Sequence, residues 1–133
     1  MNSVEAGLYG ALSAGTALVA TLGGTAIYNG VAPRGVAVPY VVFSLASGIE
    51  ENLTPTDSQR FIYNVQGVAA TLLQAGTIAD QVHALLHDQR LTVSDAINFW
   101  TSRESIIRYT EVEDTGRTLG HAGGEYLIRI VEE

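Results

Sequence analysis

The stretch from Ile27 to Ser44 constrains the fold more than any other part of the chain; its sequence is IYNGVAPRGVAVPYVVFS. It opens with a short apolar piece that ends at the turn pair Asn29-Gly30, and a polar link with proline and glycine follows. Pro39 has no backbone N–H, so it fits the first position or the edge of a strand. Tyr40 to Phe43 then forms a short apolar run, typical of a buried strand. This order predicts a strand stub, a crossing segment and a central strand of a sheet.

Four segments have the pattern of long strands. Tyr40 to about Ser47 is almost continuously apolar, which indicates a central strand covered on part of both faces. Arg60 to about Ala69 and Glu125 to Val131 alternate apolar and polar residues, so each should bury one face. Ile97 to Val112 is extended with a mixed pattern, and we predict a bulge or bend at Ser102-Arg103. We therefore expect an antiparallel sheet of about four strands.

Helices are predicted at the N-terminus and after the second main strand. Leu8 and Leu12 lie one turn apart on a common face of the first helix. Thr71 can cap a long helix from Leu72 to about Asp88, in which apolar residues recur at helical spacing. The predicted fold is an α+β domain with the helices packed on one face of the sheet. The length fits a single domain over residues 1–133.

Two polar segments interrupt the apolar pattern. Gly48 to Gln59 is predicted to be a loop by its composition, and it is longer than a tight hairpin needs. Val112 to Gly124 is predicted to be a second polar excursion that ends in a glycine-rich turn or flap. Both are candidate arms that contact other molecules.

The charge balance excludes one class of function. Seven arginines and no lysine face fourteen carboxylates, and the arginines are scattered along the chain. A net charge of −7 disfavours a surface that grips phosphate, because affinity for DNA comes mainly from basic side chains. Cysteine is absent, which excludes disulfides and fits a reducing compartment. Neither a membrane span nor a signal peptide is expected from the hydropathy pattern.

A metal site is one hypothesis for the long helix. Asp80, His83 and His87 lie near one face at a spacing that zinc-binding helices use. The HExxH signature is absent, however, and histidines on a solvated helix face explain the same pattern. The second interpretation is favoured, and no metal or cofactor is expected.

Catalysis is also disfavoured. His121 lies in the sequence GHAGG, where we interpret it as part of a flexible flap, because neither a GxSxG elbow nor a cysteine accompanies it. Glu50-Glu51 and the acidic run from Glu111 to Asp114 are carboxylate clusters that water should keep ionised in loops. Phe99, Trp100 and Tyr109 could form a contact patch, although core or interface positions are more common for aromatic residues.

The order of these elements resembles one family, the tail completion proteins (tail terminators, or tail-to-head joining proteins) of long-tailed bacteriophages. The resemblance runs through VEAGLYGALSAGTALVATLGG, IYNGVAPRGVAVPYVVFS, FIYNVQGVAAT and GRTLGHAGGEYLIRIV, and so covers nearly the whole chain in order. Leu91 to Arg103 matches only loosely. Specificity comes from the series of segments, since none of them alone is an invariant chemical motif.

The resemblance implies a structural virion protein with no catalytic residues. It implies a six-fold ring of copies of this chain at the head-proximal end of the tail tube, assembled in the host cytoplasm. The ring would stop tube growth and contact the tube protein and the head-completion or stopper protein, while genomic DNA passes through the lumen without specific binding. The candidate interface and lumen residues are Glu50, Glu51, Asp57, Glu111, Glu113, Asp114, Arg117 and His121.

Two alternatives stay open at this point. One is a different head–tail connector protein, an adaptor or a stopper, with the same ring logic and another neighbour. The other is a small cytosolic enzyme or ligand-binding domain, which a pocket holding His121 and a perturbed carboxylate would favour.

Overall fold

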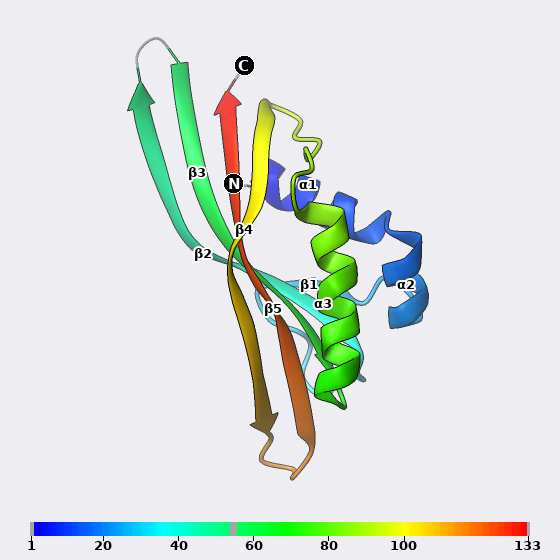
Figure 1. The fold of residues 1–133 in the computed structure, drawn as a ribbon. Coiled ribbons are helices and arrows are strands. Elements are labelled where there is room, and N and C mark those ends of the chain that lie inside the picture. The colour runs from blue at the N-terminus through cyan, green and yellow to red at the C-terminus, as the bar shows by residue number, and fades with distance from the viewer. Residues whose placement is uncertain (1, 54–55, 133) are drawn as a thin grey trace.

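A long, twisted sheet with three helices against it forms the structure, which is a computed structural model (Figure 1). It describes residues 2–53 and 56–132, without the side chains of residues 50–53, 56, 57, 99 and 132. In chain order the elements are α1 (Asn2–Ser13), α2 (Thr16–Leu22), β1 (Ile27–Asn29), β2 (Tyr40–Leu53), β3 (Thr56–Ala69), α3 (Leu72–Leu86), β4 (Ala96–Val112) and β5 (Thr118–Glu132). The prediction of an α+β fold is therefore confirmed.

The sheet of the described residues has five strands rather than about four, in the order β1-β2-β3-β5-β4. The added strand is the stub β1, which pairs in parallel with Val41 to Phe43 of β2, so the sheet is mixed and not purely antiparallel. All the other pairings are antiparallel. A strand of three residues carries too little periodicity to reveal its partner from sequence, which is why the sequence-based count was too low.

The long helix forms where its apolar spacing predicts it. Thr71 is the N-cap, and its side chain accepts a hydrogen bond from the backbone N–H of Gln74 at 3.1 Å. The buried residues of α3 recur at helical spacing and are Ala75, Ile78, Val82 and Leu86. Through this face α3 packs across β3 and β5. The apolar stripe therefore determines both the helix and the side of it that faces the sheet.

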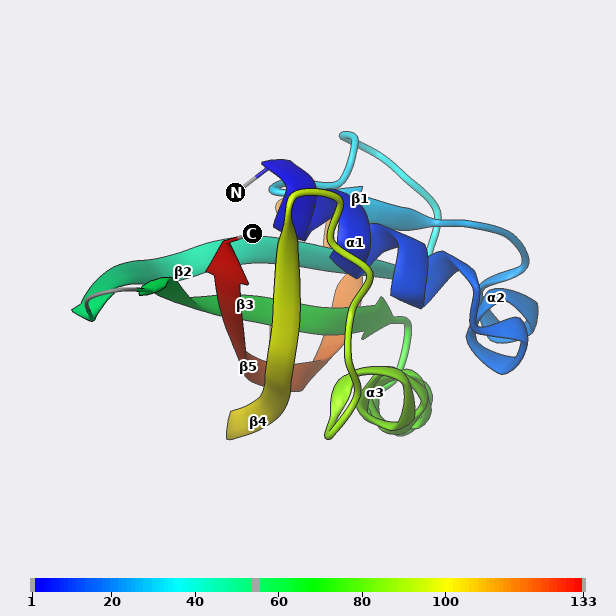
Figure 2. The same cartoon turned by 90° about the horizontal axis from the view of Figure 1, so that it is seen from above.

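One core joins all three helices to one face of the sheet. Val4, Leu8 and Leu12 of α1 are fully buried in it, and α2 and α3 contribute further aliphatic side chains. The helices lie together on one side of the sheet, as expected (Figures 1 and 2). A smaller cluster around Tyr40 and Val68 covers part of the other face, with apolar side chains of the segment between β1 and β2 packed on it. The start of β2 is thus covered on both faces, as its apolar run predicts.

The prediction of a loop from Gly48 to Gln59 is wrong. β2 continues to Leu53 and β3 begins at Thr56, and their residues pair without interruption from Ser47 to that end of the hairpin. This half of the hairpin extends beyond the helical layer (Figure 1). Polar residues are suited to a strand that no layer covers, so a polar composition there does not indicate a loop.

The second predicted excursion is also mostly strand. Only residues 113–117 lie between β4 and β5, and Gly120 and Gly123 belong to β5. A Cβ atom on Gly120 would lie 2.7 Å from the backbone at the start of α3, and one on Gly123 would lie 2.0 Å from a backbone oxygen of β3. These glycines allow close backbone approach within a strand and do not mark a flexible flap.

Two irregularities bend β4. Its pairing with β5 shifts register between Asn98 and Trp100 and again between Arg103 and Ser105. The second shift lies next to the predicted bulge at Ser102-Arg103. No helix in the described part of the chain is long and apolar enough to cross a membrane.

Candidate functional site

The acidic candidates of the sequence analysis fall on two hairpins that extend to opposite ends of the molecule (Figure 1). Glu50 and Glu51 are in β2 and Asp57 is in β3, and the backbones of Glu50 and Glu51 pair with β3. The side chains of all three lie outside the described residues. The other candidates belong to the β4–β5 hairpin. The two acidic groups are therefore separate surfaces and not one cluster.

The turn between β4 and β5 is held by an ion pair. Arg117 donates from Nε to a carboxylate oxygen of Glu113, and it donates from Nη1 to the carbonyl oxygen of Val36 at 3.3 Å. The hydrogen bond from Arg117 holds the pKa of Glu113 below its usual range. Asp114 is exposed in the same turn. The turn is thus tied to the segment that precedes β2, and part of its negative charge is neutralised.

His121 is a buried residue of β5, which overturns its interpretation as part of a flexible flap. Its Nε2 lies 2.9 Å from a carboxylate oxygen of Glu111, and its Nδ1 lies 3.1 Å from the amide oxygen of Gln66. The ring stacks on Tyr109 with centroids 4.4 Å apart, and the Tyr109 hydroxyl donates to the same amide oxygen at 3.3 Å. Both nitrogens face fixed partners, so the arrangement suits a structural tie between β3, β4 and β5.

Sequence reasoning missed Gln66 and Tyr109 as partners of His121. The register explains their proximity, because Tyr109 pairs with His121 and Gln66 lies two positions from the β3 residue opposite His121, on the same face of the sheet. The sequence offered one signal for this contact: the alternation of β3 places Gln66 on the face of the sheet away from the helices.

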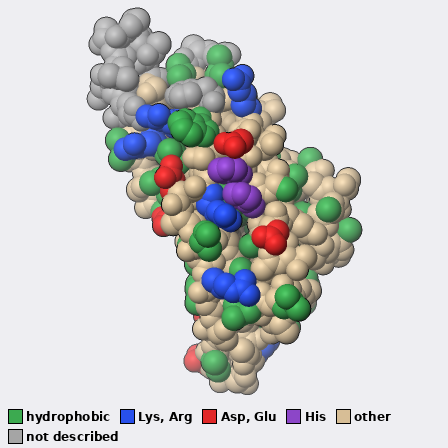
Figure 3. All heavy atoms as spheres, viewed as in Figure 1, with side chains coloured by type: hydrophobic (Ala, Val, Ile, Leu, Met, Phe, Trp, Pro, Cys, Tyr) green, Lys and Arg blue, Asp and Glu red, His purple; other side chains and the backbone are tan. Residues whose placement is uncertain are grey.

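His83 and His87 are close together but are engaged with protein groups. Their rings stack with centroids 4.5 Å apart. His83 Nδ1 lies 3.2 Å from the hydroxyl of Tyr126, and His87 Nδ1 accepts the backbone N–H of Arg103 at 3.2 Å. Burial lowers the pKa of His83, and the charge of Arg103 lowers it further. In Figure 3 the histidine side chains form one patch, with basic and acidic side chains nearby.

These contacts do not support the zinc hypothesis. No group of three or more metal-ligating side chains within reach of one ion occurs among the residues that the structure describes. Burial also raises the pKa of Tyr126 to about 12, so its hydroxyl stays protonated at neutral pH. The favoured interpretation of the helix histidines, as polar groups on the helix surface, needs one correction: they pack on Arg103 and Tyr126.

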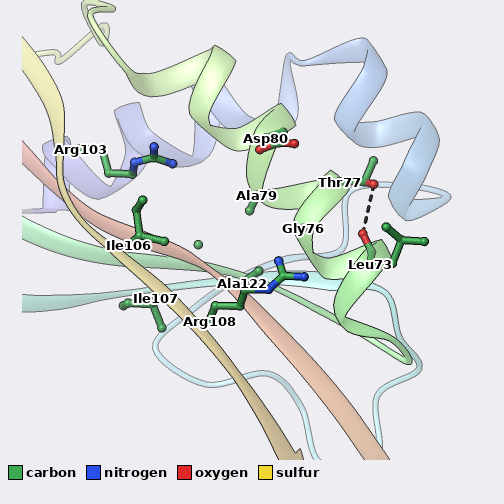
Figure 4. Close-up of a pocket in the computed structure, with 11 residues that line it drawn as sticks. Leu73, Gly76, Thr77, Ala79, Asp80, Arg103, Ile106, Ile107, Arg108 and Ala122 are labelled. Atoms are coloured by element: carbon green, nitrogen blue, oxygen red, sulfur yellow. Dashed lines mark hydrogen bonds between the residues drawn. The ribbon is translucent and has the colours of Figure 1, made fainter.

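A groove between α3 and β4 is the surface that sequence reasoning missed. Its volume is about 380 Å³, and Leu73 of α3 and Ile106 of β4 line it while remaining 81% and 71% exposed. Arg108 reaches from β4 to the helix, where a Cβ atom on Gly76 would lie 2.8 Å from the guanidinium (Figure 4). Leu73 offered a signal, because it is a leucine off the buried stripe of α3.

The exposed aromatic and aliphatic residues extend along the strands. Trp100 and Tyr109 are 48% and 46% exposed, and Ile49 is 47% exposed. The side chain of Phe99 is outside the described residues. Long strands that carry half-exposed apolar side chains between charges are suited to contacts with other proteins.

The fold and these surfaces define a small α+β protein whose exposed features suit protein–protein contact. Residues 6–118 match the family model of the tail completion protein gp17, so the chain belongs to that family of structural phage tail proteins. Its place is the tail of a phage or phage-like virion. The resemblance seen in the sequence is thereby confirmed.

Among solved structures, the chain has the fold of a chain in the virion of a native gene transfer agent (GTA) particle. The TM-score is 0.64 and the sequence identity 21%, over 93% of this chain and 91% of that chain. The comparison with curated proteins finds no match.

Proposed function

We propose that the chain forms a closed ring at the head-proximal end of the tail tube, where it ends tube growth and joins the tail to the head. The observation that carries this proposal is family membership over residues 6–118, which include the β2–β3 hairpin and β4 and end at the first residue of β5. A six-fold ring matches the symmetry that the family resemblance implies. The partners are then further copies of the chain, the tail tube protein and the head-completion or stopper protein.

A ring needs a heterologous interface, in which one patch of a subunit meets a different patch of its neighbour. Two hairpins that extend to opposite ends of one subunit, and a groove beside α3, supply distinct patches for such contacts. These features support a repeated head-to-tail arrangement better than they support a pocket for a small substrate.

The negative charge of the chain supports the proposal that DNA passes through the lumen of the ring. Each copy adds a net charge of −7, so a lumen lined by acidic residues would repel the phosphate backbone over about one Debye length, ~8 Å at physiological salt. Because the two acidic groups lie at opposite ends of the subunit, they can be tested separately. Reversal of Glu50 and Glu51 should slow DNA delivery if that hairpin lines the lumen, and reversal of Glu113 and Asp114 should do so if the β4–β5 turn does. Unchanged delivery and assembly in both variants would reject the lumen assignment.

Tube length is the direct test of the function. Without this chain, tail tubes polymerised from the tube protein should grow to variable lengths, and adding the purified chain should arrest them and leave a ring at one end. Electron microscopy of negatively stained tubes measures both results. Tubes of normal length that lack only attachment to heads would favour the connector alternative, an adaptor or a stopper.

A further inference from the structure

The outer edge of β4 is covered over one half and open over the other. The backbone N–H of Asp88 donates to the carbonyl oxygen of Thr101 at 2.8 Å, and the backbone N–H of Arg103 donates to His87 at 3.2 Å. The residues that follow α3 thus close the edge near Arg103. Farther along, β4 is the last strand of the sheet, and no described residue outside β5 pairs with it as far as Val112. Open strand edges are sites where another chain can pair.

The groove lies beside this open half. Leu73 and Ile106 supply exposed apolar surface, and Arg103 and Arg108 supply positive charge against the single carboxylate of Asp80. Among the described residues, no carboxylate forms an ion pair with Arg108. A partner that fits this surface would therefore supply a strand that pairs with β4, apolar side chains that cover the groove and carboxylates that pair with the arginines.

The same chain carries a strand edge with these properties at the other side of its sheet. β1 covers β2 only from Val41 to Phe43, and among the described residues no strand pairs with the outer edge of β2 beyond that point. Leu45 of this half of the strand is 38% exposed and pairs with the core residue Tyr63, so it faces the same side of the sheet as the helices. Glu50-Glu51 follows farther along the same strand.

We infer that the open half of β2 from a second copy pairs with the open half of β4 and covers the α3–β4 groove. Backbone hydrogen bonds extend the sheet from one copy to the next, and the pairing brings the acidic segment of β2 alongside the arginines of the groove. The contact is heterologous, because the β2 edge and the β4 edge are different surfaces, so it repeats from copy to copy. This inference rests on the ring proposed above and identifies the surfaces through which its subunits meet.

Disulfide trapping tests the contact in assembled tails, because the natural chain has no cysteine. Thr110→Cys on β4 is combined in turn with Ser44→Cys, Ala46→Cys or Ser47→Cys on β2, so that different registers are sampled. Paired strands bring opposed Cα atoms to about 4.5–5.5 Å, a distance that a disulfide can span. Mild oxidation of purified tails followed by non-reducing electrophoresis should show covalent trimers and larger species for at least one pair.

The controls separate specific pairing from chance collisions. Thr110→Cys alone can form no species larger than a dimer, since each chain then has one thiol. Thr110→Cys with Ala20→Cys on the exposed surface of α2 has two thiols but lacks the β2 position. Covalent species larger than a dimer in this control, or none in all three β2 pairs, would overturn the inference.

A charge exchange in the same trapping background tests the ionic part of the contact. Arg108→Glu in the trapping background should reduce the covalent ladder by about tenfold or more, because like charges at an interface are strongly unfavourable. Adding Glu50→Arg and Glu51→Arg should restore it.

A ladder unaffected by Arg108→Glu would refute the predicted charge match, and so would failure of the exchange to restore it. Tails that contain the chain as a ring but give no ladder would reject this contact and leave the proposed function standing. Absence of the chain from tails would instead reject the proposed function.

Discussion

The hydrogen bond between Tyr63 and Glu5 connects the central sheet to the first helix, and its removal gives a test of how the helical layer is held. Tyr63 is fully buried, and its hydroxyl donates to one carboxylate oxygen of Glu5 at 2.9 Å. The side chain of Asn29 donates to the other carboxylate oxygen at 2.7 Å. One carboxylate thereby joins α1, β1 and β3.

Tyr63→Phe removes one of these two bonds without opening a cavity. A hydrogen bond to a charged group contributes about 1.5–3 kcal/mol to the free energy of unfolding. For a domain of this size about 4 °C of melting temperature corresponds to each kcal/mol, so we expect a decrease of about 6–12 °C at neutral pH. Differential scanning calorimetry on the purified chain measures it, and Tyr9→Phe is the matched control, because Tyr9 is partly exposed on α1.

The same substitution should change the response to alkaline pH. Burial, and then the hydrogen bond to Glu5, raise the pKa of Tyr63 above its ordinary value of 10.0. A raised pKa contributes stability that is complete below pH 10.0, and this stability is lost as the pH rises further, because the phenol of the unfolded chain ionises first. Each such phenol increases the loss of unfolding free energy by at most about 1.4 kcal/mol per pH unit.

We therefore expect the stability of Tyr63→Phe to fall less steeply between about pH 10 and pH 12 than that of the natural chain. Tyr126 remains in the variant and continues to contribute to the alkaline loss, since burial raises its pKa to about 12. A melting temperature for Tyr63→Phe equal to that of Tyr9→Phe would refute the assignment of this hydrogen bond. The same conclusion would follow if the stability of Tyr63→Phe and that of the natural chain fell equally steeply with alkaline pH.

Five further substitutions test the packing and the cap of α3. Ile78→Ala in the fully buried face of α3 should lower the free energy of unfolding by about 2–5 kcal/mol, whereas Leu73→Ala on the exposed face should change it by less than about 0.5 kcal/mol; urea denaturation distinguishes them. Gly123→Ala should destabilise the fold, since its Cβ would meet a backbone oxygen of β3, while Gly10→Ala, with open space around its Cβ, should stabilise α1 by about 0.5–1 kcal/mol. Thr71→Ala should cost about 1 kcal/mol through loss of the cap of α3, and an unchanged urea midpoint would contradict that role.

Local patterns in the sequence predicted the elements whose partners are close in the chain or whose faces differ clearly. The cap at Thr71 and the apolar stripe of α3 fix the start of that helix and its buried face. The alternation at Tyr126, Ile128 and Ile130 likewise predicts the buried face of β5. Such periodicities record which side chains leave water, and that information survives without knowledge of the partner.

The sequence failed where exposure removes this signal. Both faces of a hairpin that extends beyond the helices can be polar, so the distal halves of β2 and β3 resemble a loop. In the sequence, Gly120 and Gly123 suggest a turn. In the structure they are strand residues, and they are glycines because the backbones of α3 and β3 approach them closely. The interface and lumen residues of the candidate list remain a prediction.

By itself, the sequence determined the α+β class, the positions of α3 and of the second half of β5, and the membership of a tail completion family, because these depend on local periodicity and on the order of segments. The tertiary structure alone decided that β1 pairs with β2, that His121 lies between Glu111 and Gln66, and that the residues after α3 cover only half of the β4 edge. Each of these depends on contacts between segments far apart in the chain, and only the packing of the whole domain selects such contacts.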